Sequence, residues 1–173
     1  MGSPKTGKII KKVKRAYFKR REIFMLKIYL DNCCYNRPFD LPSNPTIIFE
    51  SSAKMIIQTL IVKHKVDLVN SFVVYEEVSA IINKEKRKLI IDFLNNATIY
   101  VAKDKFNEVL ALASEIMKTG VKYMDVAHTA CAIIAGCDYL ITTDKRLLKY
   151  KSDKINIINP VDFIRMWEDK DNA

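Results

Sequence analysis

The sequence predicts an α/β protein built as a three-layer α/β/α sandwich around a short, mostly parallel sheet of about five strands. Short apolar runs alternate with longer helical patterns along the whole chain, which is typical of parallel strands joined by helices. Only 4 glycines and 5 prolines occur in 173 residues, so the connections should be short. A hydrophobic fraction of 49% is enough for a single packed core.

Five strands are predicted from the apolar runs. The first contains Ile28 and Leu30 on either side of Tyr29. The predicted strands are residues 27–30, 67–70, 97–101, 139–142 and 155–158. No internal repeat and no linker interrupts this alternation, so we expect one domain.

Helices are predicted between these strands. After the first strand, prolines mark a loop over residues 36–45, and Ser43 or Asn44 should cap the next helix, with Pro45 in its first turn. The apolar side of that helix should comprise Ile47, Ile48, Met55, Ile56, Leu60 and Ile61. Ser71 should cap the helix that carries Glu77. Further helices are expected at residues 85–93, 106–117, 125–135 and 160–167.

The net charge of +9 comes almost wholly from the N-terminus. The first 24 residues hold nine Lys or Arg and one Glu, whereas residues 25–173 hold 20 basic and 19 acidic residues. A cationic arm would attract nucleic acid without sequence preference, and a disordered extension is the simpler interpretation. A third hypothesis is that translation starts at Met25. We therefore expect an extension over 1–24, a domain over 25–167 and a C-terminal tail over 168–173.

Several features predict a cytoplasmic protein that does not enter a membrane. No apolar run approaches the roughly 20 residues of a membrane span, and no apolar segment follows the N-terminal charges as in a secretory signal. The four cysteines are therefore expected as reduced thiols. His128 and Cys131 lie three residues apart, but no second ligand pair completes a zinc site. A hydrogen-bonded histidine and a buried thiol are the simpler interpretation.

Four acidic residues fall where a parallel sheet would bring them together. Asp31 and Asp144 each come at the end of a predicted strand, whereas Glu77 and Asp125 lie in or at the start of helices. Ligands of open parallel sheets bind beyond the carboxyl ends of the strands. Carboxylates repel one another unless a cation neutralises them. We therefore expect these four residues to form a catalytic site that binds a divalent metal.

Hard carboxylate oxygens suit Mg²⁺ or Mn²⁺, and such ions promote attack of water on a phosphodiester. The three aspartates would bind the metal, and Glu77 would either bind it or hold a water molecule. Asn32 and Thr142 are short polar neighbours that would orient the carboxylates or the water. Ordinary hydrogen bonds at a turn or a strand end remain an equal alternative for both.

Structural roles remain open for the acidic residues too. Asp125 and Asp144 could each cap the helix that follows, which would occupy only one carboxylate oxygen and leave the other for a metal. Helical geometry turns Glu76 to the solvent and sets Glu77 at the border of the apolar face. Glu77 therefore needs a metal ion, or a Lys or Arg, as its partner.

These stretches resemble a PIN-domain protein of the VapC-like kind. The matching stretches lie between Met25 and Phe163 and read L-D-N-C-C-Y-N-R-P-F-D, V-V-Y-E-E-V, Y-M-D-V-A-H-T-A-C-A, A-G-C-D-Y-L-I-T-T-D-K-R-L-L and N-P-V-D-F. The resemblance sets the four family acids on Asp31, Glu77, Asp125 and Asp144. It implies a three-layer fold and metal-dependent cleavage of single-stranded or structured RNA. It also implies a toxin of a toxin–antitoxin pair, with a small antitoxin as partner and a homodimeric state.

The chain departs from the family pattern after Asp144, where some members carry a further acid and this chain has Lys145 and Arg146. One or two metals are therefore both possible. Arg37, Lys145 and Arg146 would contact RNA phosphates, although a solvated surface charge is the simpler interpretation of each. Two other functions stay open: a catalytically silent RNA-binding module, and a nucleotide-binding protein, which the lack of a Gly-rich phosphate loop disfavours.

Overall fold

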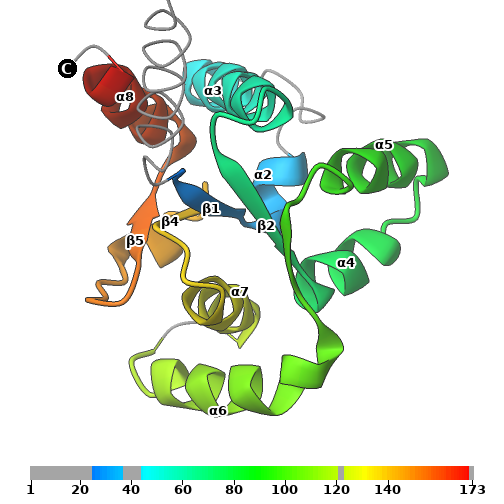
Figure 1. Ribbon diagram of the computed structural model, residues 1–173, viewed down its shortest axis with the longest axis vertical. Helices are drawn as coiled ribbons and strands as arrows, with labels where there is room; N and C mark the ends of the chain where they lie inside the picture. Colours follow the sequence, from blue (N-terminus) through cyan, green and yellow to red (C-terminus); the bar gives the residue numbers. More distant parts are fainter. Residues whose placement is uncertain (1–24, 37–43, 121–122, 172–173) are drawn as a thin grey trace, which may run out of the picture.

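Figure 1 shows the protein in a computed structural model, which describes residues 25–36, 44–120 and 123–171. Within these residues five strands form one sheet in the order β3-β2-β1-β4-β5. Every neighbouring pair is parallel, so the predicted α/β fold is confirmed. The strands are β1 (Lys27–Leu30), β2 (Asp67–Ser71), β3 (Ile99–Val101), β4 (Tyr139–Ile141) and β5 (Asn156–Ile158).

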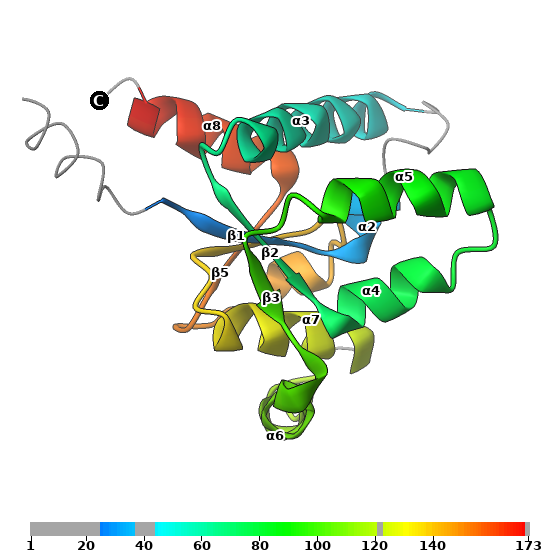
Figure 2. The same ribbon diagram turned by 45° about the vertical axis from the view of Figure 1, so that its right-hand side comes forward.

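Helices connect successive strands and cover both faces of the sheet. Figure 2 shows α3 and α8 on one side of the sheet and α6 and α7 on the other, which is the predicted three-layer arrangement. The helices are α2 (Asn32–Asn36), α3 (Pro45–Val62), α4 (Phe72–Ser79), α5 (Lys84–Leu94), α6 (Phe106–Met117), α7 (Tyr123–Ile134) and α8 (Pro160–Asp171). Among the described residues, the 3₁₀ turns η2 (Lys103–Lys105) and η3 (Leu147–Lys149) lie in the remaining connections. In the described part of the chain, no helix is both long and apolar enough to cross a membrane.

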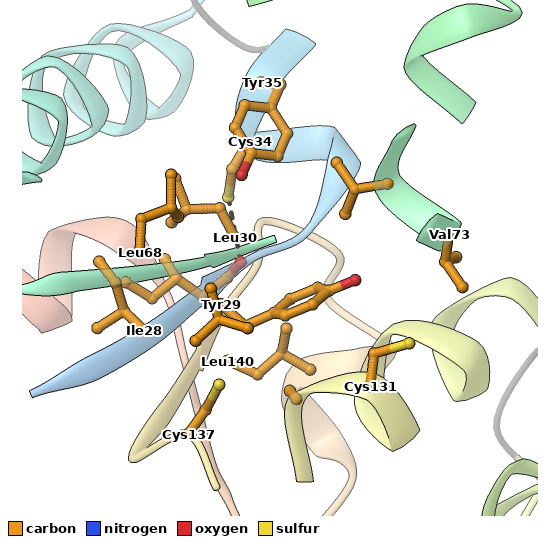
Figure 3. Close-up of a cluster of buried hydrophobic side chains, with 14 of the residues drawn as sticks. Ile28, Tyr29, Leu30, Cys34, Tyr35, Leu68, Val73, Cys131, Cys137 and Leu140 are labelled. Atoms are coloured by element: carbon orange, nitrogen blue, oxygen red, sulfur yellow. Dashed lines mark hydrogen bonds between the residues drawn. The ribbon is translucent and has the colours of Figure 1, made fainter. Parts of the chain in front are cut away.

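The central strand β1 is buried on both faces. Its residues Ile28, Tyr29 and Leu30 have no exposed surface, as expected for a strand in a parallel sheet covered by helices. In Figure 3, Tyr29 points to the side on which Cys131 of α7 lies, whereas Cys34 lies on the opposite side. Successive side chains of a strand alternate in this way, so β1 contributes to both halves of the core.

Side-chain caps start two of the helices as the sequence predicts. Asn44 Oδ1 accepts a hydrogen bond from the Ile47 amide at 3.1 Å, with Pro45 as the first helical residue of α3. Ser71 Oγ accepts from the Val74 amide at 3.3 Å at the start of α4. The open choice between Ser43 and Asn44 is thus resolved for Asn44.

The predicted apolar side of α3 is wrong in half of its residues. Ile48, Met55 and Ile56 are 48%, 62% and 47% exposed. Glu50 and Lys54 are buried instead, because each has a polar partner from a distant segment. The Lys54 ammonium donates to the backbone carbonyl of Cys34 and lies 4.7 Å from the centre of the Tyr35 ring. Glu50 Oε1 accepts from the side-chain amide of Asn159 at 3.0 Å.

Two other local predictions need correction. The chain after β1 turns into the short helix α2 at Asn32, before the predicted loop, although these residues show no helical period in the sequence. Helix α7 begins at Tyr123, two residues before Asp125, so Asp125 lies in its first turn and is not its cap. Gly136 follows the end of α7, and its φ of +65° explains why a glycine stands there.

The strand order changes direction at β1. The chain first builds β2 and β3 on one side of β1 and later adds β4 and β5 on the other. The Asp31 amide donates to the carbonyl of Ile141 at 3.0 Å, which ties the carboxyl end of β1 to that of β4. This is the switch point at which open parallel sheets bind ligands.

Candidate active site

Asp31 follows β1 directly and is held in one orientation. Its carboxylate is buried, with 5% of the residue exposed. Oδ2 accepts hydrogen bonds from the Thr142 hydroxyl at 2.7 Å and from the Cys33 thiol at 3.1 Å. Oδ1 lies 3.6 Å from His128 Nε2. Three segments of the chain therefore determine where this carboxylate points.

Thr142 joins two of the predicted acids. Its hydroxyl donates to Asp31 Oδ2 and accepts from the Asp144 amide at 3.0 Å. The residue has no exposed surface and follows β4 directly. A buried hydroxyl with both functions satisfied is a rigid link between the ends of β1 and β4.

Asp144 lies in the turn that leads into η3. Its Oδ1 accepts the Arg146 amide at 2.7 Å, and its Oδ2 lies 3.4 Å from the Arg146 guanidinium. Burial alone would raise the pKa of Asp144, but these hydrogen bonds and the arginine charge outweigh it and lower the pKa below its usual range. Asp144 therefore stabilises the turn, but it does not cap η3, whose N-cap residue is Arg146 and has no side-chain cap hydrogen bond.

Asp125 shares its electrostatic environment with the other two aspartates. Burial and then the negative charges of Asp144 and Asp31 raise the pKa of Asp125, and His128 and Arg146 offset them only partly. The carboxylate comes from the first turn of α7, far along the chain from β1. Three distant segments thus bring three carboxylates near enough to repel one another.

Glu77 reaches the same region from α4 and contacts a histidine there. The sequence indicated a metal ion, or a Lys or Arg, as its partner. Glu77 Oε2 lies 2.8 Å from His128 Nε2, a contact that the sequence did not predict, and the metal stays a prediction. The Glu77 side chain is 21% exposed and therefore only partly withdrawn from solvent. Its neighbour Glu76 pairs with Lys103 at the surface, at 2.8 Å, in agreement with its expected exposure.

His128 connects the acidic residues with the core. It lies one helical turn after Asp125, is 1% exposed, and places Nδ1 2.9 Å from the Tyr29 hydroxyl. The Tyr29 hydroxyl in turn lies 2.6 Å from Ser71 Oγ. Burial lowers the pKa of His128, but the Glu77 hydrogen bond and the charges of Asp31 and Glu77 outweigh it and raise the pKa above its usual value.

Sequence reasoning missed two residues that contact the predicted acids. His128 was interpreted only as a hydrogen-bonded histidine, although its position three residues after Asp125 puts both on one helical face. Cys33 contacts Asp31 because α2 turns the chain back on itself, and the sequence carried no signal for that turn. The hydrogen bond from Cys34 lowers the pKa of the Cys33 thiol in spite of its burial.

The remaining predicted residues are distributed unevenly. Asn32 hydrogen-bonds with Asn36, whose side-chain nitrogen lies 3.2 Å from the Asn32 carbonyl. Arg146 reaches the acidic cluster through Asp144, and Lys145 is exposed beside it. Arg37 lies outside the described residues. Of the predicted polar and basic neighbours that the structure describes, Thr142 and Arg146 contact the acids.

The donor chemistry of the cluster fits a hard divalent cation. Its donors are carboxylate oxygens. Burial, and then the negative charges of Asp144 and Asp31, raise the pKa of Asp125, and Arg146 offsets them only partly. Among residues 25–36, 44–120 and 123–171, no three His, Cys, Asp or Glu side chains already stand in a metal-holding arrangement. A bound cation would reduce the electrostatic repulsion between these carboxylates.

Comparison with known proteins gives a family match. The family model described as PIN domain matches residues 46–152, more than half of the chain. This range includes Glu77, Asp125 and Asp144 and begins after Asp31. The solved structure of VapBC2 from Rickettsia felis bound to a DNA fragment from their promoter aligns at 16% identity with a TM-score of 0.48, over 78% of this chain and 98% of that chain. No curated protein matches the sequence.

Proposed function

The chain belongs to the PIN-domain family, and we propose that it is a metal-dependent endoribonuclease that hydrolyses phosphodiester bonds of RNA in the cytoplasm. PIN domains are generally nucleases. The observation that carries the proposal is that two buried side chains join the acids. The Thr142 hydroxyl contacts Asp31 Oδ2 and the Asp144 amide, and His128 Nε2 lies 3.6 Å from Asp31 Oδ1 and 2.8 Å from Glu77 Oε2. Such a cluster beyond the carboxyl ends of parallel strands is suited to a cation and a phosphodiester.

In this proposal Asp31, Asp125 and Asp144 hold Mg²⁺ or Mn²⁺, and Glu77 completes the site. When bound, the metal would activate water and stabilise negative charge on the phosphate. Thr142 holds the Asp31 carboxylate by a hydrogen bond to Oδ2. The other oxygen of Asp31, Oδ1, is not used in this bond. His128 fixes Glu77 through Oε2, which leaves Oε1 for a ligand or a water molecule.

A cleavage assay tests this function. The full chain is incubated with defined single-stranded and structured RNAs in Mn²⁺ and in EDTA, beside Asp31→Asn and the surface variant Asp92→Asn. We expect the wild type and Asp92→Asn to cleave RNA in Mn²⁺ only. The cleavage rate of Asp31→Asn should be lower by a factor on the order of 100 or more, as for the loss of an essential catalytic group. Equal cleavage by Asp31→Asn, with an unchanged circular dichroism spectrum, would contradict the proposal.

We further propose that this nuclease is the toxin of a toxin–antitoxin pair and acts as a homodimer. The support is the VapC-like resemblance of its motifs, such as the D-x-x-H start of α7. Expression of the chain should arrest growth of a host cell, and co-expression of a small neighbouring gene should restore it. Sedimentation of the purified chain should give twice the monomer mass of 20.0 kDa. Growth that continues with active enzyme present would exclude the toxin role.

A second candidate is a catalytically silent PIN-fold module that binds RNA. It is favoured by one observation, that the described residues contain no ready metal-holding arrangement. The same assay separates the two functions, because a silent module binds RNA in EDTA and leaves it intact in Mn²⁺.

A further inference from the structure

A basic pocket adjoins the candidate active site. It has a volume of about 390 Å³ and is lined by Thr119, Gly120, Asp125, Arg146, Leu147, Lys149, Tyr150 and Lys151. One wall is thus the half-buried carboxylate whose pKa the other aspartates raise. The rest contributes three basic side chains and one aromatic ring. A cationic pocket next to a cluster of carboxylates is unusual in a body that carries nearly equal numbers of acidic and basic residues.

The basic wall of the pocket is firmly attached to the active-site turn. Leu147 is fully buried and anchors η3 in the core. The Leu148 amide donates to the Asp144 carbonyl at 3.0 Å, and the Lys149 amide donates to the Arg146 carbonyl at 3.1 Å. The backbone that carries the cationic side chains is therefore in fixed register with Asp144. Charges on such a frame can position a ligand relative to the carboxylates.

Tyr150 separates this pocket from a second one with a different character. The neighbouring pocket has a volume of about 250 Å³ and also contacts Thr119, Tyr150 and Lys151. Its other charged residues are Glu115, Asp153 and Lys154, so positive and negative charges balance there. The excess of positive charge is therefore confined to the first pocket, and the half-buried Tyr150 lines both pockets.

We propose that the basic pocket binds one nucleotide of the RNA strand adjacent to the bond that is cut. Arg146, Lys149 and Lys151 would hold its phosphate, and Tyr150 would stack against its base. This inference rests on the proposed ribonuclease function and identifies the residues that position its substrate. The volume suits a single nucleotide, and an aromatic ring beside basic side chains is the usual combination for single-stranded nucleic acid.

Recognition by charge and by stacking differ in their dependence on salt. Each phosphate contact contributes about 0.7 to the slope of log affinity against log salt for a single strand. Stacking contributes affinity without such a slope. The two halves of the proposal can therefore be measured separately in one titration series.

The test uses the full chain in EDTA, where the metal is removed and binding alone is measured. Fluorescence anisotropy follows a labelled single-stranded RNA of about 12 nucleotides, a length typical of single-strand binding sites. The double variant Lys149→Ala/Lys151→Ala should bind about tenfold or more weakly, with a salt slope smaller by up to about 0.7, since the two lysines hold one phosphate. The matched double variant Lys84→Ala/Lys88→Ala removes the same charge from α5, which leads into β3 at the opposite sheet edge, and should change little.

Tyr150 is tested by a pair of variants because it also packs against the core. Tyr150→Leu should weaken binding about tenfold with an unchanged salt slope, whereas Tyr150→Phe keeps the ring and should bind like the wild type. In Mn²⁺ the Tyr150→Leu enzyme should show a raised KM with kcat largely kept, since the ring positions substrate and touches no reacting atom. Circular dichroism and thermal unfolding establish that both variants are folded.

The outcomes distinguish this inference from the proposed function. If RNA is cleaved but the Lys149/Lys151 and Tyr150 variants bind and cleave like the wild type, the pocket assignment is wrong and the nuclease stands. If nothing is cleaved but these variants lose RNA binding in EDTA, the pocket stands and the nuclease proposal fails. Displacement of RNA by an acidic peptide at lower concentration than by unlabelled RNA would assign the pocket to a protein partner and overturn the inference.

Discussion

The Thr142 hydroxyl donates a hydrogen bond to Asp31 Oδ2 at 2.7 Å. The oxygen of this hydroxyl, Thr142 Oγ1, also accepts a hydrogen bond from the Asp144 amide at 3.0 Å. One buried side chain thus connects two acids that lie more than a hundred residues apart. The connection crosses from the end of β1 to the end of β4, the place where the strand order changes direction. Its removal should therefore affect both the stability of the fold and the geometry of the acids.

Thr142→Val tests that connection with little change in volume. It leaves a buried carboxylate oxygen and a backbone amide each short of one partner, which should cost about 1–3 kcal/mol of unfolding free energy. We expect cleavage to fall at the same time, because Asp31 loses its orientation. Urea unfolding and initial cleavage rates are the measurements. The control is Thr98→Val, since Thr98 makes a comparable 2.9 Å bond to Asp67 at an exposed site; equal losses in both variants would contradict a special role for Thr142.

His128 is expected to matter for the stability of the site as well as for its chemistry. His128→Leu removes the partner of Glu77 Oε2 and one of the two partners of the Tyr29 hydroxyl, and it should lower the unfolding free energy by about 1–3 kcal/mol. His128→Gln retains a donor for Glu77 and should lose less. Chemical denaturation of both variants provides the comparison. Identical stability of the two would mean that the Glu77 contact contributes nothing.

Much of this architecture could be predicted from local patterns. The five strands and the caps Asn44 and Ser71 depend on short stretches of sequence, and all are present. The positions of Asp31 and Asp144 at one sheet edge followed from the rule that parallel strands end on the same side. These features depend on the residues of a single strand or of a single helix N-terminus.

The parts that could not be predicted depend on distant partners. Lys54 is buried because its ammonium finds the Cys34 carbonyl and the Tyr35 ring, and no helical period contains that information. Glu77 similarly contacts a histidine on another helix, a partner that the sequence did not predict. The side of α3 that faces the core was mispredicted for this reason, since polar side chains with partners can replace apolar ones.

Asp125→Asn should separate stability from function. Because burial and the neighbouring carboxylates raise the pKa of Asp125, its ionised form is disfavoured in the folded protein at neutral pH. The neutral amide should therefore raise the melting temperature in EDTA, modestly, since solvent screens the part-exposed side chain. The same variant should lose the stabilisation that Mn²⁺ gives to the wild type. A lower melting temperature in EDTA would contradict the account of repulsion among the aspartates.

Lys54 predicts a specific dependence of stability on alkaline pH. Burial lowers the pKa of Lys54 from 10.5 to about 8. Between those two values the unfolded chain binds more protons than the folded one, so the Lys54 contribution to stability rises with pH there and is most unfavourable below pH 8. The shift corresponds to about 3 kcal/mol as an order of magnitude.

The difference between wild type and Lys54→Met isolates this effect, because the buried thiols and tyrosines titrate in both proteins. Unfolding free energies should be measured from about pH 7 to about pH 10.5. The unfolding free energy of the wild type should increase relative to that of Lys54→Met as the pH rises. A constant difference over this range would show that Lys54 keeps an ordinary pKa.

Calorimetric titration of the full chain with Mn²⁺ tests the central claim, which is that acids from distant segments hold one shared cation. The account predicts saturable binding that weakens about tenfold or more in each of Asp31→Asn, Asp125→Asn and Asp144→Asn, and stays unchanged in Asp92→Asn. Wild-type affinity in all three aspartate variants, or no binding by the wild type, would contradict it.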